Sequence, residues 1–248
     1  MSGHSKWAKI KRAKGGNDAR RGAVFTKLAR EVQVAAREGG GDPSGNVRLR
    51  LAIQKARDNN MPADNIKRAI DRAVGGAANE QLEEVTYEGY GPNGVAVLIH
   101  AMPDNRNRTA SDIRAAFTRG GGALGESGCV AWLFDLRGVI TVVTGKSNPE
   151  DIALAAIDAG AEDVKADSEI VEIYTEPNVL EMVREALASQ KLVIDSAETT
   201  LLPKTMVELD VEHATQFLKL VERLDDLDDV QHVYFNAEIP DAVLQAER

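Results

Sequence analysis

The sequence predicts an α+β protein of three domains, in which an N-terminal three-helix domain precedes two ferredoxin-like α/β domains, one inserted in the other. Apolar residues recur at helical spacing in the first third of the chain and at alternate positions after residue 80. A complete βαββαβ order then follows in the middle of the chain. The 248 residues, 43% of them apolar, suffice for two or three buried cores. The expected domains are 1–78, the discontinuous pair 79–135 and 204–248, and the insertion 136–203.

Three helices are expected in the N-terminal domain. The first begins near Asn17 and has an apolar stripe at Phe25, Leu28, Val32 and Ala36. Its opposite side, expected to be cationic, carries Arg20, Lys27, Arg30 and Arg37. The glycine-rich loop 39–46 ends this helix and offers Asn46 as the N-cap of the second. The third helix is expected over 62–75, because Pro62 suits a first turn and Gly75 suits a helix end.

The rest of the chain is expected to alternate between strands and helices. Two strands within 83–102 are joined by a turn at 89–94, followed by a helix over 107–119 and a strand over 129–134. The insertion contains strands at 138–144, 163–167, 169–175 and 191–202, with helices at 149–159 and 177–189. A strand at 205–210, a helix at 212–227 and a strand at 230–236 complete the outer α/β domain.

Charge is unevenly distributed along the chain. Residues 1–76 contain 17 Lys and Arg against 7 Asp and Glu, a balance of +10. The remaining residues contain 13 basic and 32 acidic side chains, a balance of −19, so the whole chain has a net charge of −9. A basic end on an acidic body is suited to meeting a polyanion at that end. The N-terminal domain is therefore the expected nucleic-acid-binding part.

The basic arm lies ahead of the first expected helix and has cations at nearly every second position from Lys6 to Lys14. It supplies most of the predicted nucleic-acid contacts. Its cations can replace counterions condensed on phosphates, and Trp7 can stack on an unpaired base for about 1–3 kcal/mol. The alternative is a solvated tail that Trp7 anchors to the domain. The predicted contact residues are His4, Lys6, Trp7, Lys9, Lys11, Arg12, Lys14, Arg20, Arg21, Lys27 and Arg30.

The string DNRNRT at 104–109 is a second candidate phosphate contact, through Arg106 and Arg108. The alternative is helix capping, in which Asn105, Asn107 or Thr109 satisfies the first amides of the following helix. A separate group of carboxylates lies at 225–229 and lacks the ligand spacing of a calcium loop. It is interpreted as a solvated acidic face.

Motifs for catalysis or cofactor binding do not fit. Gly89-x-Gly91-x-x-Gly94 leads into a strand rather than the helix that a dinucleotide site requires. The sequence Gly145-Lys146-Ser147 lacks the first glycine of a phosphate-binding loop. The four histidines are scattered, and Cys129 is the sole cysteine, which excludes an intrachain disulfide. No catalytic residue, cofactor, metal or membrane span is predicted, and a cytoplasmic location is expected.

Several strings resemble the YebC family over nearly the whole chain. They are GHSKWA at 3–8, RGAVFTKLAREV, GGGDP at 39–43, NNMP at 59–62, YEGYGPNG at 87–94, DNRNRT at 104–109 and AGAEDV at 159–164. Bacterial members are described as probable transcriptional regulators, and a mitochondrial relative activates translation of cytochrome oxidase subunit I. The resemblance implies three domains, a cytoplasmic location and nucleic-acid binding through the N-terminal domain.

Three functions remain open on the sequence. The preferred one is a non-enzymatic, DNA-binding transcriptional regulator, with a ribosome- or RNA-binding translation factor as the alternative target class. The second is a protein-interaction adaptor whose acidic domains bind a partner. The third is an enzyme with a site between the two α/β domains, a function that no motif supports.

Overall fold

The computed structural model describes residues 18–75, 82–145, 147–167 and 169–246. The chain divides into two compact units, one containing Trp132–Met206 and the other containing Gly3–Ala131 with Val207–Arg248. The expected boundary at 78 falls outside the described residues and stays a prediction. None of the described helices has the length and apolar character that crossing a membrane requires. The protein is of the α+β class, with a helical region followed by α/β regions built on antiparallel sheets.

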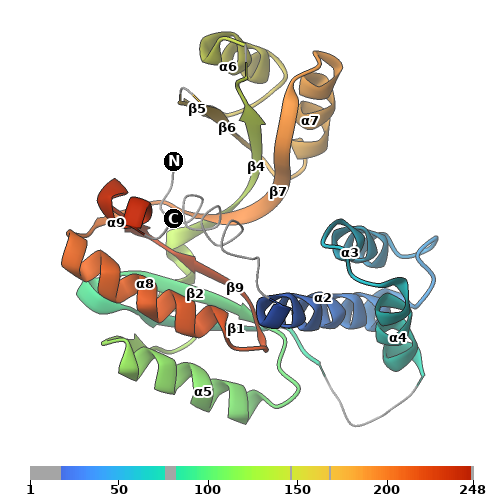
Figure 1. The fold of residues 1–248 in the computed structure, drawn as a ribbon, viewed down its shortest axis with the longest axis vertical. Helices are drawn as coiled ribbons and strands as arrows, with labels where there is room; N and C mark the ends of the chain where they lie inside the picture. The colour runs from blue at the N-terminus through green and yellow to red at the C-terminus, as the bar shows by residue number, and fades with distance from the viewer. Residues whose placement is uncertain (1–17, 76–81, 146, 168, 247–248) are drawn as a thin grey trace. The chain divides into compact units, whose positions relative to one another are not determined.

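Three helices form the N-terminal part of the larger unit, as predicted (Figure 1). They are α2 (Asp18–Gly39), α3 (Val47–Asp58) and α4 (Ala63–Val74). Leu28 and Val32 of α2 pack against Leu49 and Ile53 of α3 and against Ile66 of α4 in one apolar core. This core fixes the positions of the basic side chains on the outer surfaces of the helices.

Asn46 caps α3, as its position in the sequence predicted. Its side-chain Oδ1 accepts a hydrogen bond from the Leu49 amide at 3.0 Å. Its Nδ2 donates to the carbonyls of Ala35 at 2.7 Å and Gly40 at 2.8 Å. Because Asn46 is buried, this one side chain both starts α3 and ties it to the end of α2.

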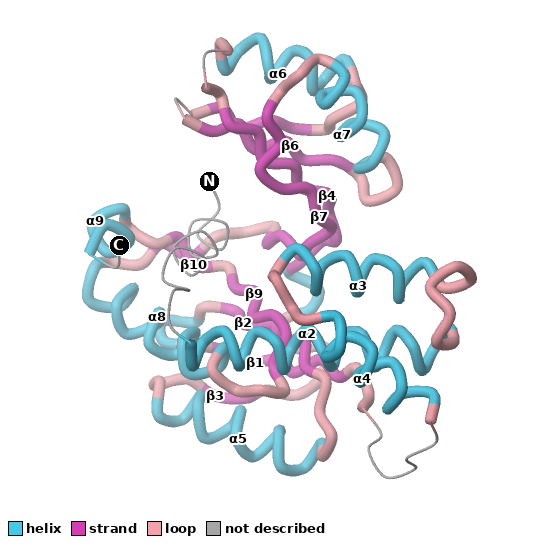
Figure 2. Tube along the Cα trace, turned by 45° about the vertical axis from the view of Figure 1, so that its right-hand side comes forward, coloured by secondary structure: helices cyan, strands magenta, loops and turns pink. Residues whose placement is uncertain are grey.

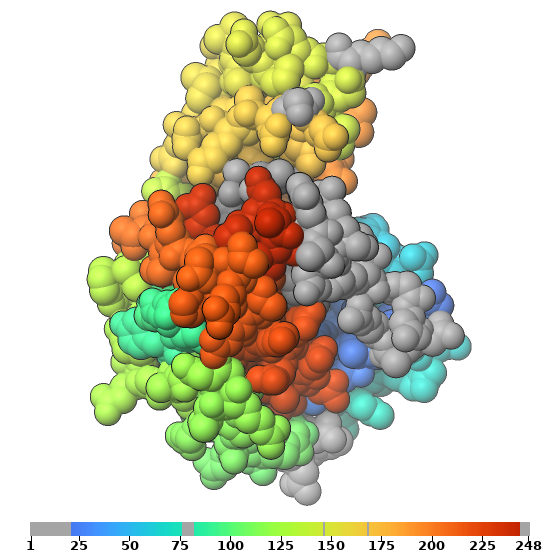
Figure 3. Space-filling view, turned by 60° about the vertical axis from the view of Figure 1, so that its left-hand side comes forward, coloured from blue at the N-terminus to red at the C-terminus, as the bar shows by residue number. Residues whose placement is uncertain are grey.

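The larger unit also contains a four-stranded antiparallel sheet of order β3-β1-β2-β9. Its strands are β1 (Val85–Tyr90), β2 (Ala96–Ala101), β3 (Ala123–Leu124) and β9 (Val230–Phe235). Helices α5 (Arg106–Arg119) and α8 (Val211–Asp225) pack on one face of this sheet. Their surfaces, green for α5 and orange for α8, adjoin in Figure 3. Phe117 of α5 and Phe217 of α8 share their core with Ile99 and Phe235 of the sheet.

The smaller unit has the predicted βαββαβ order (Figure 2). Its elements are β4 (Phe134–Val143), α6 (Pro149–Asp158), β5 (Asp163–Ala166), β6 (Ile170–Thr175), α7 (Leu180–Ser189) and β7 (Val193–Pro203). The sheet order β5-β6-β4-β7 is antiparallel throughout and matches the ferredoxin-like arrangement. Both helices cover the face that carries Ile140, Val142, Val171 and Ile173.

The two sheets have the same spatial plan but different connections. In the smaller unit, β6 lies beside the first strand, β4, and comes after helix α6 in the sequence. In the larger unit the equivalent place is taken by β1, which precedes β2 and pairs with it through a short turn at Pro92–Gly94. The larger sheet is therefore a ferredoxin-like arrangement with one strand supplied from the start of the domain.

The strand predicted at 129–134 is wrong for most of its length. Residues Ala131–Leu133 form a 3-10 turn, and β4 begins only at Phe134. The Glu88 carboxylate accepts hydrogen bonds from the amides of Gly128 (2.6 Å), Val130 (2.7 Å) and Ala131 (2.8 Å). Backbone groups that bind a side chain cannot also pair with a neighbouring strand.

Smaller differences lie at element ends. The strand predicted at 205–210 is only β8 (Val207–Glu208), which pairs in parallel with β10 (Ala237–Glu238). Helix α7 begins three residues later than predicted, at Leu180. The sequence patterns did not predict β3, β10 or the short helix α9 (Asp241–Ala246).

Candidate nucleic-acid interface

The DNRNRT segment starts helix α5. The Asn105 side chain accepts hydrogen bonds from the amides of Asn107 (3.1 Å) and Arg108 (3.2 Å). The capping interpretation is therefore confirmed for Asn105. Arg106 and Arg108 lie in the first turn with side chains 66% and 54% exposed.

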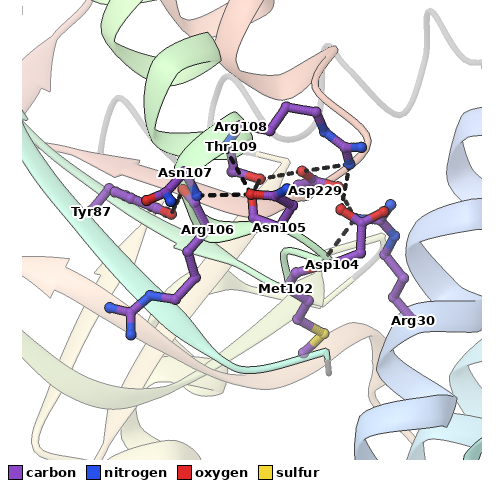
Figure 4. Close-up of polar contacts among 10 residues, drawn as sticks. All are labelled: Arg30, Tyr87, Met102, Asp104, Asn105, Arg106, Asn107, Arg108, Thr109 and Asp229. Carbon is purple, nitrogen blue, oxygen red and sulfur yellow. Dashed lines mark hydrogen bonds and ion pairs between the residues drawn. The ribbon is translucent and has the colours of Figure 1, made fainter. Parts of the chain in front are cut away.

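Asp229 is the centre of a polar cluster beside this turn (Figure 4). Its carboxylate accepts a hydrogen bond from the Thr109 hydroxyl and forms an ion pair with Arg30. The Arg108 guanidinium lies 3.6 Å from the same carboxylate and pairs also with Asp104. Figure 4 shows Arg30, Arg108 and Thr109 converging on Asp229, whereas the guanidinium of Arg106 points away from it.

The interpretation of 225–229 as a solvated acidic face is wrong for Asp229, which is buried. Burial by itself raises the pKa of Asp229, but the hydrogen bonds from Thr109 and Arg30 and the charges of Arg30 and Arg108 outweigh it. The pKa of this carboxyl is therefore held below its usual value. Asp229 is a charged, structural carboxylate in the folded chain.

Helix α2 is joined to the sheet domain by the side that the sequence predicted to be cationic. Lys27 donates to the Asp225 carbonyl at 2.6 Å, and Arg30 donates to the Met102 carbonyl at 3.0 Å. Val34, one turn further along α2, packs against Leu82 and Met102. Lys27, Arg30 and Val34 are three or four positions apart, so they lie on one side of α2 and form a second stripe that contacts the rest of the unit.

The predicted contact residues have different places in the structure. His4, Lys6, Trp7, Lys9, Lys11, Arg12 and Lys14 lie outside the described residues. Arg20 and Arg21 lie in the first turn of α2, where Arg21 is exposed. Lys27 and Arg30 are half-buried in the contacts above. The structure does not bring Arg106 and Arg108 together with one another, because Arg106 approaches Glu83 at 3.8 Å and Arg108 turns to Asp104.

The predicted contact residues include no basic side chain of α3 or α4. Within the described residues, four exposed cations of the helical region have no ion pair or side-chain hydrogen bond; they are Arg37, Arg57, Lys67 and Arg72. Their neighbour Arg68 donates to the Asp64 carbonyl at 3.2 Å and to Asn65 Oδ1 at 2.9 Å. The signal was available, since Lys67, Arg68 and Arg72 fall on the polar side of a strongly amphipathic helix.

A groove of about 220 Å³ lies between α2 and α4. Phe25, Ala29 and Gln33 of α2 form one side of the groove. Ala69 of α4 lies opposite, with Arg68 and Arg72 at the edge. Neither Asp nor Glu is among the lining residues, so the groove combines apolar side chains with polar ones and with the two cations Arg68 and Arg72.

Comparisons with known proteins assign the chain to a family. Residues 5–76 match the TACO1/YebC protein N-terminal domain, and residues 82–237 match the TACO1/YebC second and third domain. The chain belongs to the TACO1/YebC family. The N-terminal match contains α2, α3 and α4, and with them the groove and the exposed cations.

Relatives in the TACO1/YebC family match this chain from end to end. A protein from Herpetosiphon aurantiacus named "Probable transcriptional regulatory protein" is 54% identical over 246 residues, which cover 99% of this chain and 98% of that protein. A protein of the same name from Moorella thermoacetica is 56% identical over 247 residues, covering 98% of each chain. The crystal structure of a conserved hypothetical protein from Aquifex aeolicus has a TM-score of 0.78 at 48% identity, covering 90% of this chain and 92% of that one.

Proposed function

We propose that this TACO1/YebC protein is a non-catalytic regulator of gene expression that binds nucleic acid through its N-terminal helical domain. The observation that carries this proposal is the separation of charge, +10 over residues 1–76 against −19 over the rest. The basic domain attracts a polyanion and the acidic domains are repelled by it, so the protein binds in one orientation. A cytoplasmic location belongs to the same proposal.

The exposed cations of the described helices support this assignment. Arg37, Arg57, Lys67 and Arg72 are free of acidic partners within the described residues, so a phosphate can bind them without displacing an internal contact. The arm residues predicted above would add to this surface. Lys27 and Arg30 contribute differently, because their present contacts with Asp225 and Asp229 hold α2 on the sheet domain.

Duplex DNA is the first candidate target, because similar proteins carry the name "Probable transcriptional regulatory protein". RNA, free or in the ribosome, is the second. It is favoured by Trp7, which lies among the cations of the arm and suits stacking on unpaired bases better than reading a duplex groove.

The salt dependence of binding tests the proposal. If about six phosphates are neutralised, the logarithm of the affinity for a duplex falls with the logarithm of the salt concentration with a slope near −5. Deletion of residues 2–14 should make that slope shallower. A slope near zero in the intact protein, or the same affinity after the deletion, would contradict the proposal.

Sedimentation of cell lysate separates the two target classes. Co-migration with ribosomal particles that ribonuclease abolishes and deoxyribonuclease does not would support RNA. The opposite sensitivity would support DNA. A protein complex that persists at high salt after both nucleases would instead favour an adaptor that acts through the acidic domains.

A further inference from the structure

We propose that the groove between α2 and α4 is a binding site for one unpaired nucleotide of a nucleic-acid strand. This inference rests on the proposed function and names the part of the helical domain that recognises the target. The nucleobase would lie against the apolar lining residues Phe25, Ala29 and Ala69. The phosphates on either side would meet Arg68 and Arg72 at the rim.

Gln33 is the observation that points to a ligand with polar edges. Its side chain lines the groove and the residue is only 9% exposed, yet within the described chain no hydrogen bond satisfies its amide. The amide nitrogen and oxygen are not among the side-chain atoms closed to water, so they can meet a ligand that enters the groove. The amide offers both donors and an acceptor, and the edge of a nucleobase presents the complementary groups.

The rim of the groove has the geometry for phosphate. Arg68 and Arg72 lie four positions apart on α4, so their side chains leave the same face of the helix one turn apart. The Arg68 guanidinium is oriented by the Asp64 carbonyl and by Asn65 Oδ1, which use its Nε and one terminal nitrogen. The other terminal nitrogen remains available for a phosphate oxygen.

The groove favours a single strand over a duplex. A base that is paired and stacked cannot enter a site bounded by side chains of two packed helices, whereas an unpaired base exposes its face and its edges. Phe25 is half-buried and belongs to the core of the helical region, so its ring is already fixed before a base stacks on it. Little side-chain entropy would be lost on binding.

Binding of labelled single-stranded RNA, single-stranded DNA and the matching duplexes to the full-length protein tests this inference. The variants are Gln33→Leu and the pair Arg68→Ala with Arg72→Ala. The matched control is Arg57→Ala with Lys67→Ala, which removes the same charge from exposed positions of α3 and α4 that do not line the groove. Thermal unfolding of each variant shows that it is folded.

The groove variants should lose affinity for single strands more than affinity for duplexes. The groove pair should lower single-strand affinity by between about 10-fold and 150-fold, the range for loss of charge-assisted hydrogen bonds to phosphate, with a smaller effect on duplex. Gln33→Leu should weaken single-strand binding while leaving the unfolding temperature about the same, because the Gln33 amide makes no hydrogen bond within the described chain. The control pair should lower both affinities alike. Comparison of the RNA and DNA probes shows which kind of strand the protein prefers.

Two results would overturn the inference and leave the proposed function standing. One is an equal loss for the groove pair and the control pair on every probe, which would mean diffuse attraction by charge. The other is unchanged single-strand binding by Gln33→Leu. Absence of binding to any probe by the unaltered protein would instead remove the proposed function itself.

Discussion

Helices α2 and α4 both carry basic residues on one side, but the structure uses those residues in opposite ways. In α2, Lys27 and Arg30 turn inward to the Asp225 carbonyl and to the buried Asp229. In α4, Lys67 and Arg72 remain exposed and free of acidic partners among the described residues, and Arg72 borders a groove. A basic helix face therefore does not by itself indicate a binding surface. The role of a basic residue depends on whether another part of the chain supplies a carboxylate or carbonyl that binds it.

Loss of the contacts that Asp229 makes with Arg30 and Thr109 should reduce the unfolding free energy most. Asp229→Ala removes the partner of Arg30 and Thr109 and leaves a guanidinium that is only 15% exposed without its carboxylate. Loss of one member of such a pair should cost about 3 kcal/mol of unfolding free energy. Urea denaturation measures this cost, with Asp228→Ala as the exposed control. Equal midpoints for the two variants would mean that the Asp229 cluster is not a structural junction.

The N-caps Asn46 and Asn105 compare the stability contributed by a buried cap with that of an exposed one. Asn46→Ala should cost about 2 kcal/mol, because two buried hydrogen bonds and one part-buried hydrogen bond are lost. Asn105→Ala should cost about 1 kcal/mol, because its two bonds lie at an exposed helix start. Denaturation midpoints of the two variants give the order directly. A larger cost at Asn105 would contradict the comparison.

Acid should weaken the inward contacts. The pKa of Asp229 and that of Glu88 are below their usual values: burial opposes the shift, but hydrogen bonds outweigh it in both, with ion pairs adding at Asp229. The unfolded chain therefore binds more protons, so this stability is present above the ordinary carboxyl pKa of about 4 and is lost as the pH falls below it. The unfolding free energy measured from pH 7 down to pH 3 should fall less steeply in Asp229→Asn than in the unaltered protein. Parallel curves would show that Asp229 does not contribute.

Substitution of the exposed cations of α4 should have the smallest effect on stability. Arg72→Ala and Lys67→Ala should each change the unfolding free energy by no more than about 0.5 kcal/mol, because neither side chain has an ionic partner among the described residues. Thermal unfolding checks this expectation. A loss comparable to that of Asp229→Ala would mean that these residues serve the fold rather than a ligand.

Short-range patterns predicted much of this fold. Periodicity predicted α2, α3 and α4 and the βαββαβ order of the smaller unit, and Asn46 was predicted as a cap from its place at the end of the glycine-rich loop. These features depend on neighbours within a few positions. The candidate phosphate contacts in the arm lie outside the described residues and stay predictions.

Long-range contacts account for the errors. The predicted strand at 129–134 failed because Glu88, 42 residues before Val130, binds its amide. Asp229 was placed on the surface because its partner Arg30 is 199 residues away. The groove was missed because it exists only where α2 and α4 pack together. Periodicity shows which face of an element is apolar but not which distant residue will meet the other face.

Nucleic-acid affinity of two charge-matched variants tests most directly whether the helical domain is the binding part. The first variant replaces four exposed helical cations by alanine: Arg37, Arg57, Lys67 and Arg72. The second replaces four exposed cations of the α/β parts: Arg114, Arg119, Lys191 and Lys219. At low salt the first should bind RNA and DNA at least about tenfold more weakly, with a shallower salt dependence, and the second should bind as the unaltered protein does. Equal losses in the two variants would contradict the assignment of binding to the helical domain.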